Sequence, residues 1–86
     1  MTPDVAAAIA ILERLRALAR NRKQRGRPLL APLRPAGASL IWWMQSEPVR
    51  IASAKLAWHG YRAAANRSEW LLSIRAAIED LGGRAP

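Results

Sequence analysis

Apolar residues recur at helical spacing over the first quarter of the chain. From residue 3 to about residue 23, one face collects the apolar side chains Val5, Ala8, Ile9, Ile11, Leu12, Leu15, Leu18 and Ala19. Thr2 suits an N-cap, Pro3 suits the first helical position, and Asp4 complements the positive end of the helix dipole. The pattern therefore predicts an amphipathic helix over this stretch.

A second helix is predicted from Glu47 to about Ala65, with Ser46 and Pro48 at its start. It has two apolar stripes on opposite sides: Val49, Ala52, Leu56, Gly60 and Ala63 on one, and Ile51, Ala54, Trp58, Tyr61 and Ala65 on the other. A helix that is apolar on two sides is expected to be buried on two sides. We therefore expect one stripe to face the core and the other to face a connector, a second copy or a partner.

The third periodic stretch begins with a capping box. Asn66 is followed three residues later by Glu69, a spacing at which the two side chains satisfy free backbone N–H groups. One apolar stripe then contains Trp70, Leu71, Ile74, Ala77, Ile78 and Leu81. Gly82 and Gly83 are typical of a helix end.

Between the first two helices the chain is rich in proline. Gly26 and Pro28 supply the stop of the first helix, and prolines at 28, 32 and 35 exclude both a continuous helix and a central strand. We expect an extended linker or a strap over the core. The apolar run at 40–45 is too short for its period to decide. Ser39 as N-cap favours a short helix there, and a single edge or dimer-forming strand is the alternative.

These elements define an all-α fold of three to four helices with a Pro-rich connector. We predict one domain over residues 1–86, made of a basic amphipathic helix (1–25), the linker (26–38) and a helical core (39–86). A chain of 86 residues buries only about 60–65% of the surface that it exposes when unfolded. We therefore expect a homodimer or a subunit of a complex.

The composition argues against enzymatic and metal chemistry. The chain has no cysteine and one histidine, His59, which lacks a Ser, Asp or Glu placed nearby in sequence to form a relay. We predict no catalytic residues, no metal site and no cofactor. The N-terminus carries Asp4 where a signal peptide would be basic, and apolar runs stay far below the roughly 18 residues of a membrane span. We therefore expect a cytoplasmic protein that does not enter membranes.

The positive charge lies in one segment. The formal net charge is +8, and residues 14–34 contain eight basic side chains and no acidic one, whereas the rest of the chain has six of each sign. We predict that these eight residues contact nucleic-acid phosphates: Arg14, Arg16, Arg20, Arg22, Lys23, Arg25, Arg27 and Arg34. The alternative is that they only complement the negative end of the first helix. The prediction does not separate DNA from RNA, or either from an acidic protein surface.

Part of this segment is similar to a known DNA-binding strip. The residues Arg25, Gly26, Arg27 and Pro28 resemble the core of the AT-hook, in which an Arg-Gly-Arg-Pro strip lies in an A·T minor groove. The resemblance implies an extended strip in which the glycine allows close approach to the groove and the two arginines follow its floor. Members of that family continue with basic residues, whereas this chain continues with Leu29, which indicates a return to the core.

Aromatic residues suggest a second class of function. The adjacent Trp42 and Trp43 are not expected to point inward together, and Trp58 lies on the second face of its helix. Large aromatic side chains are enriched at binding hot spots. We predict a protein interface formed by Trp42, Trp43, Ile51, Trp58 and Tyr61. The corresponding function is that of a small inhibitor or adaptor, of the kind that phages and mobile elements encode, bound to a host protein or defence complex.

Overall fold

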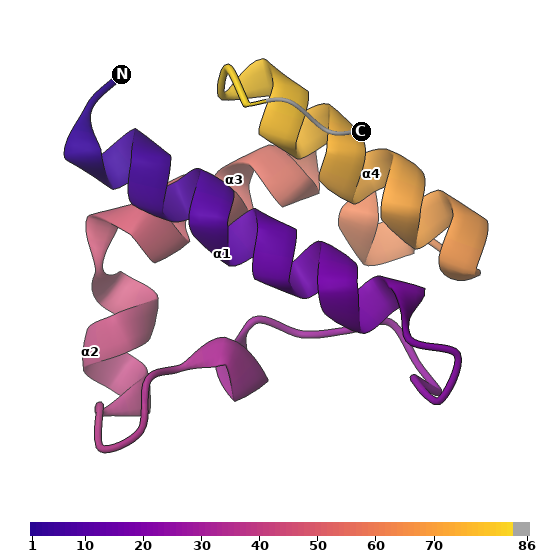
Figure 1. Cartoon of the computed structure of the whole chain (residues 1–86), viewed down its shortest axis with the longest axis horizontal. Helices are drawn as coiled ribbons and strands as arrows, with labels where there is room; N and C mark the ends of the chain where they lie inside the picture. The colour runs from indigo at the N-terminus through magenta and orange to yellow at the C-terminus, as the bar shows by residue number, and fades with distance from the viewer. Residues whose placement is uncertain (84–86) are drawn as a thin grey trace.

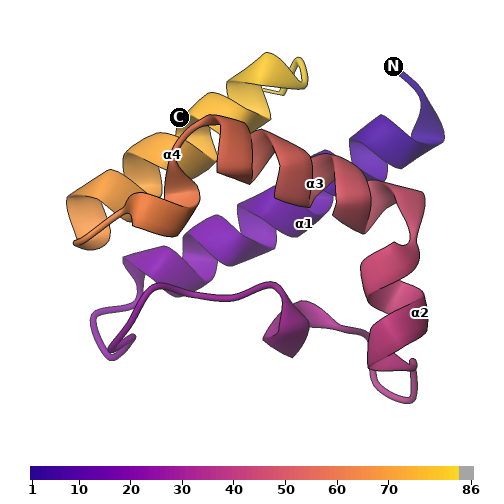
Figure 2. The same cartoon turned by 180° about the vertical axis from the view of Figure 1, so that it is seen from behind.

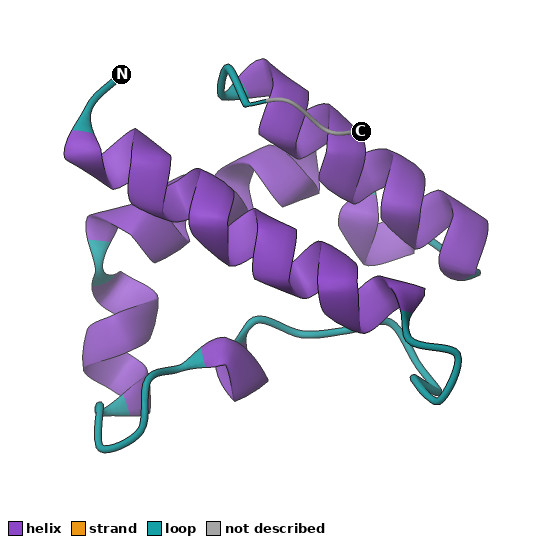
Figure 3. Ribbon diagram, in the orientation of Figure 1, coloured by secondary structure: helices purple, strands orange, loops and turns teal. Residues whose placement is uncertain are grey.

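The computed structural model describes residues 1–83, and within them the regular structure is entirely helical. Four α-helices are joined by loops and by two single 3-10 turns (Figures 1 and 3). Their bounds are α1 Pro3–Arg20, η1 Ala31–Leu33, α2 Leu40–Gln45, α3 Glu47–Trp58, η2 Tyr61–Ala63 and α4 Arg67–Asp80. The predicted all-α fold class is confirmed, and the run at 40–45 is the expected short helix rather than a strand.

The predicted starts of α1 and α4 are formed by their capping side chains, whereas the Ser46 side chain before α3 does not cap that helix and donates to the Trp43 carbonyl oxygen. Thr2 Oγ1 accepts a hydrogen bond from the Val5 backbone N–H at 3.2 Å. At the start of α4, Asn66 Oδ1 accepts from the Glu69 N–H at 3.0 Å. The Glu69 carboxylate in turn accepts from the Ala65 N–H at 3.1 Å, one residue before the N-cap. Each cap satisfies N–H groups that have no partner within the helix.

The core lies where α1 packs against both α3 and α4 (Figure 2). The helices contribute one buried stripe each, together with Leu33 and Tyr61 from the turns: Ala8, Ile9, Leu12, Leu15 and Ala19 from α1, Ala52 and Leu56 from α3, and Trp70, Ile74, Ala77 and Ile78 from α4. The large members Leu12, Leu15, Ile74 and Ile78 are fully buried. Burial of each such side chain contributes roughly 1.5–3 kcal/mol to stability.

The second predicted helix is shorter than its apolar pattern indicates. We expected it to reach about Ala65, but α3 ends at Trp58. Gly60 has a φ of +80°, the left-handed conformation that ends helices and that glycine adopts without strain. The chain then turns through η2, so Tyr61 no longer follows the register of Trp58. The outward stripe of α3 is therefore limited to Ile51, Ala54 and Trp58.

The first helix also ends earlier than expected, at Arg20 instead of about residue 23. Asn21 Oδ1 accepts a hydrogen bond from the Lys23 N–H at 3.0 Å and so stabilises a turn at this point. From the start of α4, Arg67 Nε donates to the Ala19 carbonyl oxygen at 2.9 Å. The Arg67 side chain thus supplies a hydrogen bond to a carbonyl oxygen that the next turn of α1 would otherwise have satisfied.

The Pro-rich connector is a strap held against the core, as one of the two expectations stated. Pro28 is fully buried and Leu33 is buried beside α1. The Tyr61 hydroxyl donates to the Pro28 carbonyl oxygen. Burial raises the pKa of Tyr61 to about 12, although the nearby Arg27 cation acts in the opposite direction. The phenol therefore stays protonated and keeps donating throughout the physiological pH range.

The short helix α2 stands at the opposite end of the molecule from the loop that follows α1 (Figures 1 and 2). None of its residues is buried, and Trp43 is the side chain that packs, half-buried, against the core. Among residues 1–83, no helix is both long enough and apolar enough to pass through a bilayer.

Candidate nucleic-acid interface

Three of the predicted cations are exposed in one loop. Arg22, Lys23 and Arg25, here called the basic loop, follow the end of α1, and none has an ion pair with an acidic residue of the described chain. The backbone beneath them is fixed, because Arg67 donates to the Asn21 and Gln24 carbonyl oxygens at 3.2 and 3.1 Å. The loop therefore presents its cations to solvent from a braced backbone.

Two further predicted residues lie in a groove beside the loop. The α1–α4 groove has a volume of about 340 Å³ and is lined by Arg16, Arg20, Ser68, Leu71, Leu72 and Arg75. Within residues 1–83 no carboxylate belongs to this lining. Arg75 of the lining forms an ion pair with Glu79, outside it, at 2.9 Å. Arg20 is both the last residue of α1 and part of the lining, so it joins the groove to the basic loop.

The other predicted cations are placed elsewhere. Arg14 Nη1 donates to the Leu33 carbonyl oxygen at 3.1 Å and ties α1 to the connector. The Arg27 guanidinium carbon lies 5.2 Å from the centre of the Tyr61 ring, a cation–π distance. Arg34 is exposed on the connector. The structure thus brings Arg20 and the basic loop together. Arg16 lines the same groove but is only 7% exposed, and it has a contact within the fold, as Arg14 and Arg27 do.

The AT-hook resemblance does not extend to the structure. A strip that enters a minor groove has to offer its whole length to the nucleic acid, but Pro28 is fully buried and its carbonyl oxygen accepts from Tyr61. Arg27 is held over the Tyr61 ring. Binding in that manner would require the connector to leave the core. We therefore interpret Gly26 and Pro28 as residues that shape the connector against the core.

Three polar residues of this surface were missed by the sequence reasoning. Arg67, Ser68 and Arg75 belong to α4, which is distant in sequence from the basic segment. Arg67 positions the loop, and the other two line the groove. The sequence did contain one signal for Arg67 and Ser68. They directly follow the Asn66 cap, and residues in the first turn of a helix lie at the end of the bundle, where a polar surface can form. That these residues face α1 is known only from the way the helices pack.

The predicted protein-interface residues do not form one surface. Trp42 and Trp58 are 81% and 82% exposed, in agreement with the expectation that some tryptophans lie outside the core. Trp43 and Ile51 are half-buried against the core. Tyr61 is only 4% exposed, so its assignment to an exposed face with Trp58 is wrong. The helix end at Gly60 is the physical reason, because it turns the Tyr61 side chain inward.

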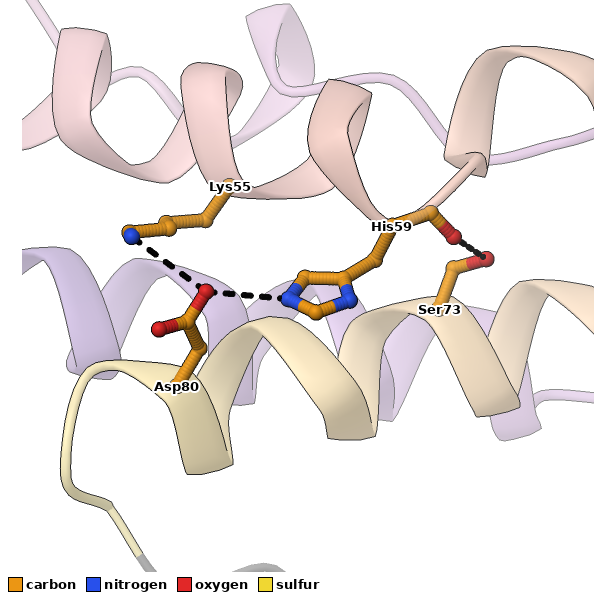
Figure 4. A network of polar contacts seen from close by, with 4 residues as sticks. All are labelled: Lys55, His59, Ser73 and Asp80. Carbon is orange, nitrogen blue, oxygen red and sulfur yellow. Dashed lines mark hydrogen bonds and ion pairs between the residues drawn. The ribbon is translucent and has the colours of Figure 1, made fainter.

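A polar cluster surrounds the single histidine (Figure 4). The Asp80 carboxylate lies 3.0 Å from His59 Nε2 and 3.2 Å from Lys55 Nζ. Hydrogen bonds from His59 and then Lys55 lower the pKa of Asp80. The sequence places no Ser, Asp or Glu close to His59 along the chain, and its carboxylate partner in the fold, Asp80, is 21 residues away. Ser73 donates to the backbone oxygen of His59 rather than to its ring, so the cluster joins α3 to α4 and does not form a nucleophile–base pair.

Within residues 1–83 no three metal-binding side chains come together in a group that would hold an ion. Comparisons of the chain with known protein families, with curated proteins and with solved structures find no match.

Proposed function

We propose that this protein is a non-enzymatic, nucleic-acid-binding regulatory protein that contacts phosphates through the α1–α4 groove and the adjacent basic loop. The observation that supports it is the continuity of these two features through Arg20, with cations in both and no carboxylate in the groove lining. We place this activity in the cytoplasm.

The chemistry of the surface suits a phosphate backbone. Guanidinium groups donate to phosphate oxygens in a fixed, planar arrangement, and the Ser68 hydroxyl adds a neutral donor. Leu71 and Leu72 form the apolar part of the groove, which matches the sugar face better than a base edge. We therefore expect binding that depends little on sequence and strongly on salt.

The test is a titration of labelled duplex DNA, single-stranded DNA and RNA at two salt concentrations. If about six phosphates are contacted, the affinity falls on the order of a thousandfold between about 50 and 200 mM salt. The double variant Arg22→Ala/Arg25→Ala should lower the slope of log K against log salt by about 1.8. Arg50→Ala/Arg62→Ala removes the same charge outside the interface and should leave the slope unchanged. Absence of binding at about 50 mM salt to all three probes, or equal slopes for the two variants, would contradict the proposal.

One observation favours a second function, the inhibitor or adaptor. Trp58 is 82% exposed, and Ala54 on the same side of α3 is also exposed, next to Ile51, which is half-buried against the core. We infer that this side of α3 contacts a second copy or a host protein. Light scattering of the wild type and of Trp58→Ser tests the first case: an oligomer that becomes monomeric in the variant supports a homodimer, and a monomer in both excludes it.

A further inference from the structure

We propose that a second surface, separate from the α1–α4 groove, docks a short segment of a partner protein that carries apolar side chains at one end and carboxylates at the other. The surface is a groove of about 280 Å³ between the connector and α3, here called the connector groove. Its lining is Arg27, Pro28, Leu29, Leu30, Ala31, Met44, Ser53, Leu56, Ala57, Tyr61 and Arg62.

The walls of the groove are apolar and partly uncovered. Leu29 of the connector is 58% exposed and Met44 of α2 is 38% exposed, although both line the groove. Ala57 of α3 also belongs to the lining and is exposed. Exposed apolar side chains that gather around a concave surface mark a binding site more often than scattered ones do. The volume is slightly below the roughly 300–1,000 Å³ of small-molecule pockets, so a few apolar side chains fit it better than a cofactor.

The charges of the groove are all of one sign and lie toward one end. Among the described residues, its ionisable side chains besides Tyr61 are Arg27 and Arg62, and none of its lining residues carries a carboxylate. Both arginines come from segments next to Tyr61, whereas Met44 belongs to α2, which stands at the other end of the molecule (Figure 2). The Arg27 guanidinium is held over the Tyr61 ring. A docked segment therefore has its carboxylates at the arginine end and its apolar side chains toward Met44.

The same charges favour an acidic partner over a second copy. Each chain has a formal net charge of +8, so two copies meeting at this groove would bring positive segments together. A segment that carries carboxylates gains charge-assisted hydrogen bonds to the two guanidinium groups instead. Ile41, three residues before Met44 on α2, is also exposed.

The experiment uses a labelled peptide of about ten residues with leucines in its first half and glutamates in its second half. One control peptide has the same composition with the glutamates spread evenly, and the other has glutamine in place of glutamate. By fluorescence anisotropy, we expect the first peptide to bind the wild-type protein at least about tenfold more tightly than either control. Equal affinity of the three peptides, or no binding of the first at millimolar concentration, would overturn the proposal.

Variants locate the site. Leu29→Ser/Met44→Ser removes apolar wall without touching the core, and Arg62→Ala removes one cation; each should weaken the first peptide about tenfold. The matched controls Leu72→Ser and Arg34→Ala change side chains outside the groove and should leave affinity unchanged. Arg22→Ala/Arg25→Ala should also leave it unchanged, which separates this site from the nucleic-acid interface. Far-UV circular dichroism checks that each variant folds. Loss of affinity in the controls, or its retention in the groove variants, would contradict the assignment.

Discussion

Arg67, the first residue of α4, donates a hydrogen bond from Nε to the carbonyl oxygen of Ala19, near the end of α1, at 2.9 Å. The last carbonyl oxygens of a helix have no partner within it and form the negative end of its dipole. The same guanidinium also donates to the Asn21 and Gln24 carbonyl oxygens. One cation from a distant helix therefore both ends α1 and fixes the loop that carries the proposed phosphate contacts.

This arrangement predicts a large effect of Arg67 on stability. Arg67→Ala removes three hydrogen bonds to a charged donor, and we expect the free energy of unfolding to fall by about 2–3 kcal/mol. Arg67→Lys should restore less than half of this loss, because one ammonium group does not span three carbonyl oxygens as the planar guanidinium does. Urea unfolding followed by tryptophan fluorescence measures both. A lysine variant as stable as the wild type would show that charge alone is sufficient.

The sequence predicted the starts of the helices better than their ends. Thr2, Ser39 and Asn66 are followed closely by the N–H groups that they cap, so their roles depend on neighbours in sequence. The end of α1 depends on Arg67, which is 48 residues from Ala19, and no local pattern contains that information. The burial of Tyr61 has a similar origin, because its partner Pro28 is 33 residues away.

The proposed nucleic-acid interface was likewise only partly predictable from the sequence. The charge count by segment identifies Arg20, Arg22, Lys23 and Arg25 without any structure. It does not separate these from Arg14 and Arg27, whose contacts with Leu33 and Tyr61 arise only when the connector folds back. Arg75 enters the groove because α4 packs beside α1, which also lies beyond a local pattern.

The helix end at Gly60 predicts opposite effects of alanine at two glycines. At Gly60 the φ of +80° strains any side chain by roughly 1–2 kcal/mol, which exceeds the gain from a less flexible unfolded chain. We expect Gly60→Ala to destabilise the protein by about 1 kcal/mol. At Gly26 an added Cβ meets no atom within 4 Å and φ is not positive, so Gly26→Ala should be neutral or stabilising by up to about 1 kcal/mol. Thermal unfolding of the pair gives the comparison, and equal destabilisation at both sites would refute the conformational argument.

The Asp80 cluster predicts a loss of stability in acid. Because the folded state lowers the pKa of Asp80, the ionised carboxylate stabilises the fold above the unfolded pKa of about 3.9, and this contribution disappears as the pH falls through the folded pKa. Asp80→Asn should therefore show a smaller drop in melting temperature than the wild type when the pH is lowered from about 6 to about 2.5. Glu13→Gln, which neutralises an exposed carboxylate without a described ion pair, serves as the control. Identical pH profiles for the wild type and Asp80→Asn would remove the role assigned to the cluster.

Arg14 and Arg22 should separate stability from phosphate binding. Both are exposed arginines of the basic segment, but the Arg14 guanidinium donates to the Leu33 carbonyl oxygen, whereas that of Arg22 has no partner within the described residues. Arg14→Ala should cost about 1 kcal/mol of stability and leave the salt dependence of nucleic-acid affinity near that of the wild type. Arg22→Ala should leave stability unchanged and lower the slope of log K against log salt by about 0.9. Urea unfolding and salt titrations of both variants test the two halves together. If Arg14→Ala lowers the slope as much as Arg22→Ala does, the phosphate contacts extend along α1 toward the connector, and the interface is wider than the groove and the basic loop.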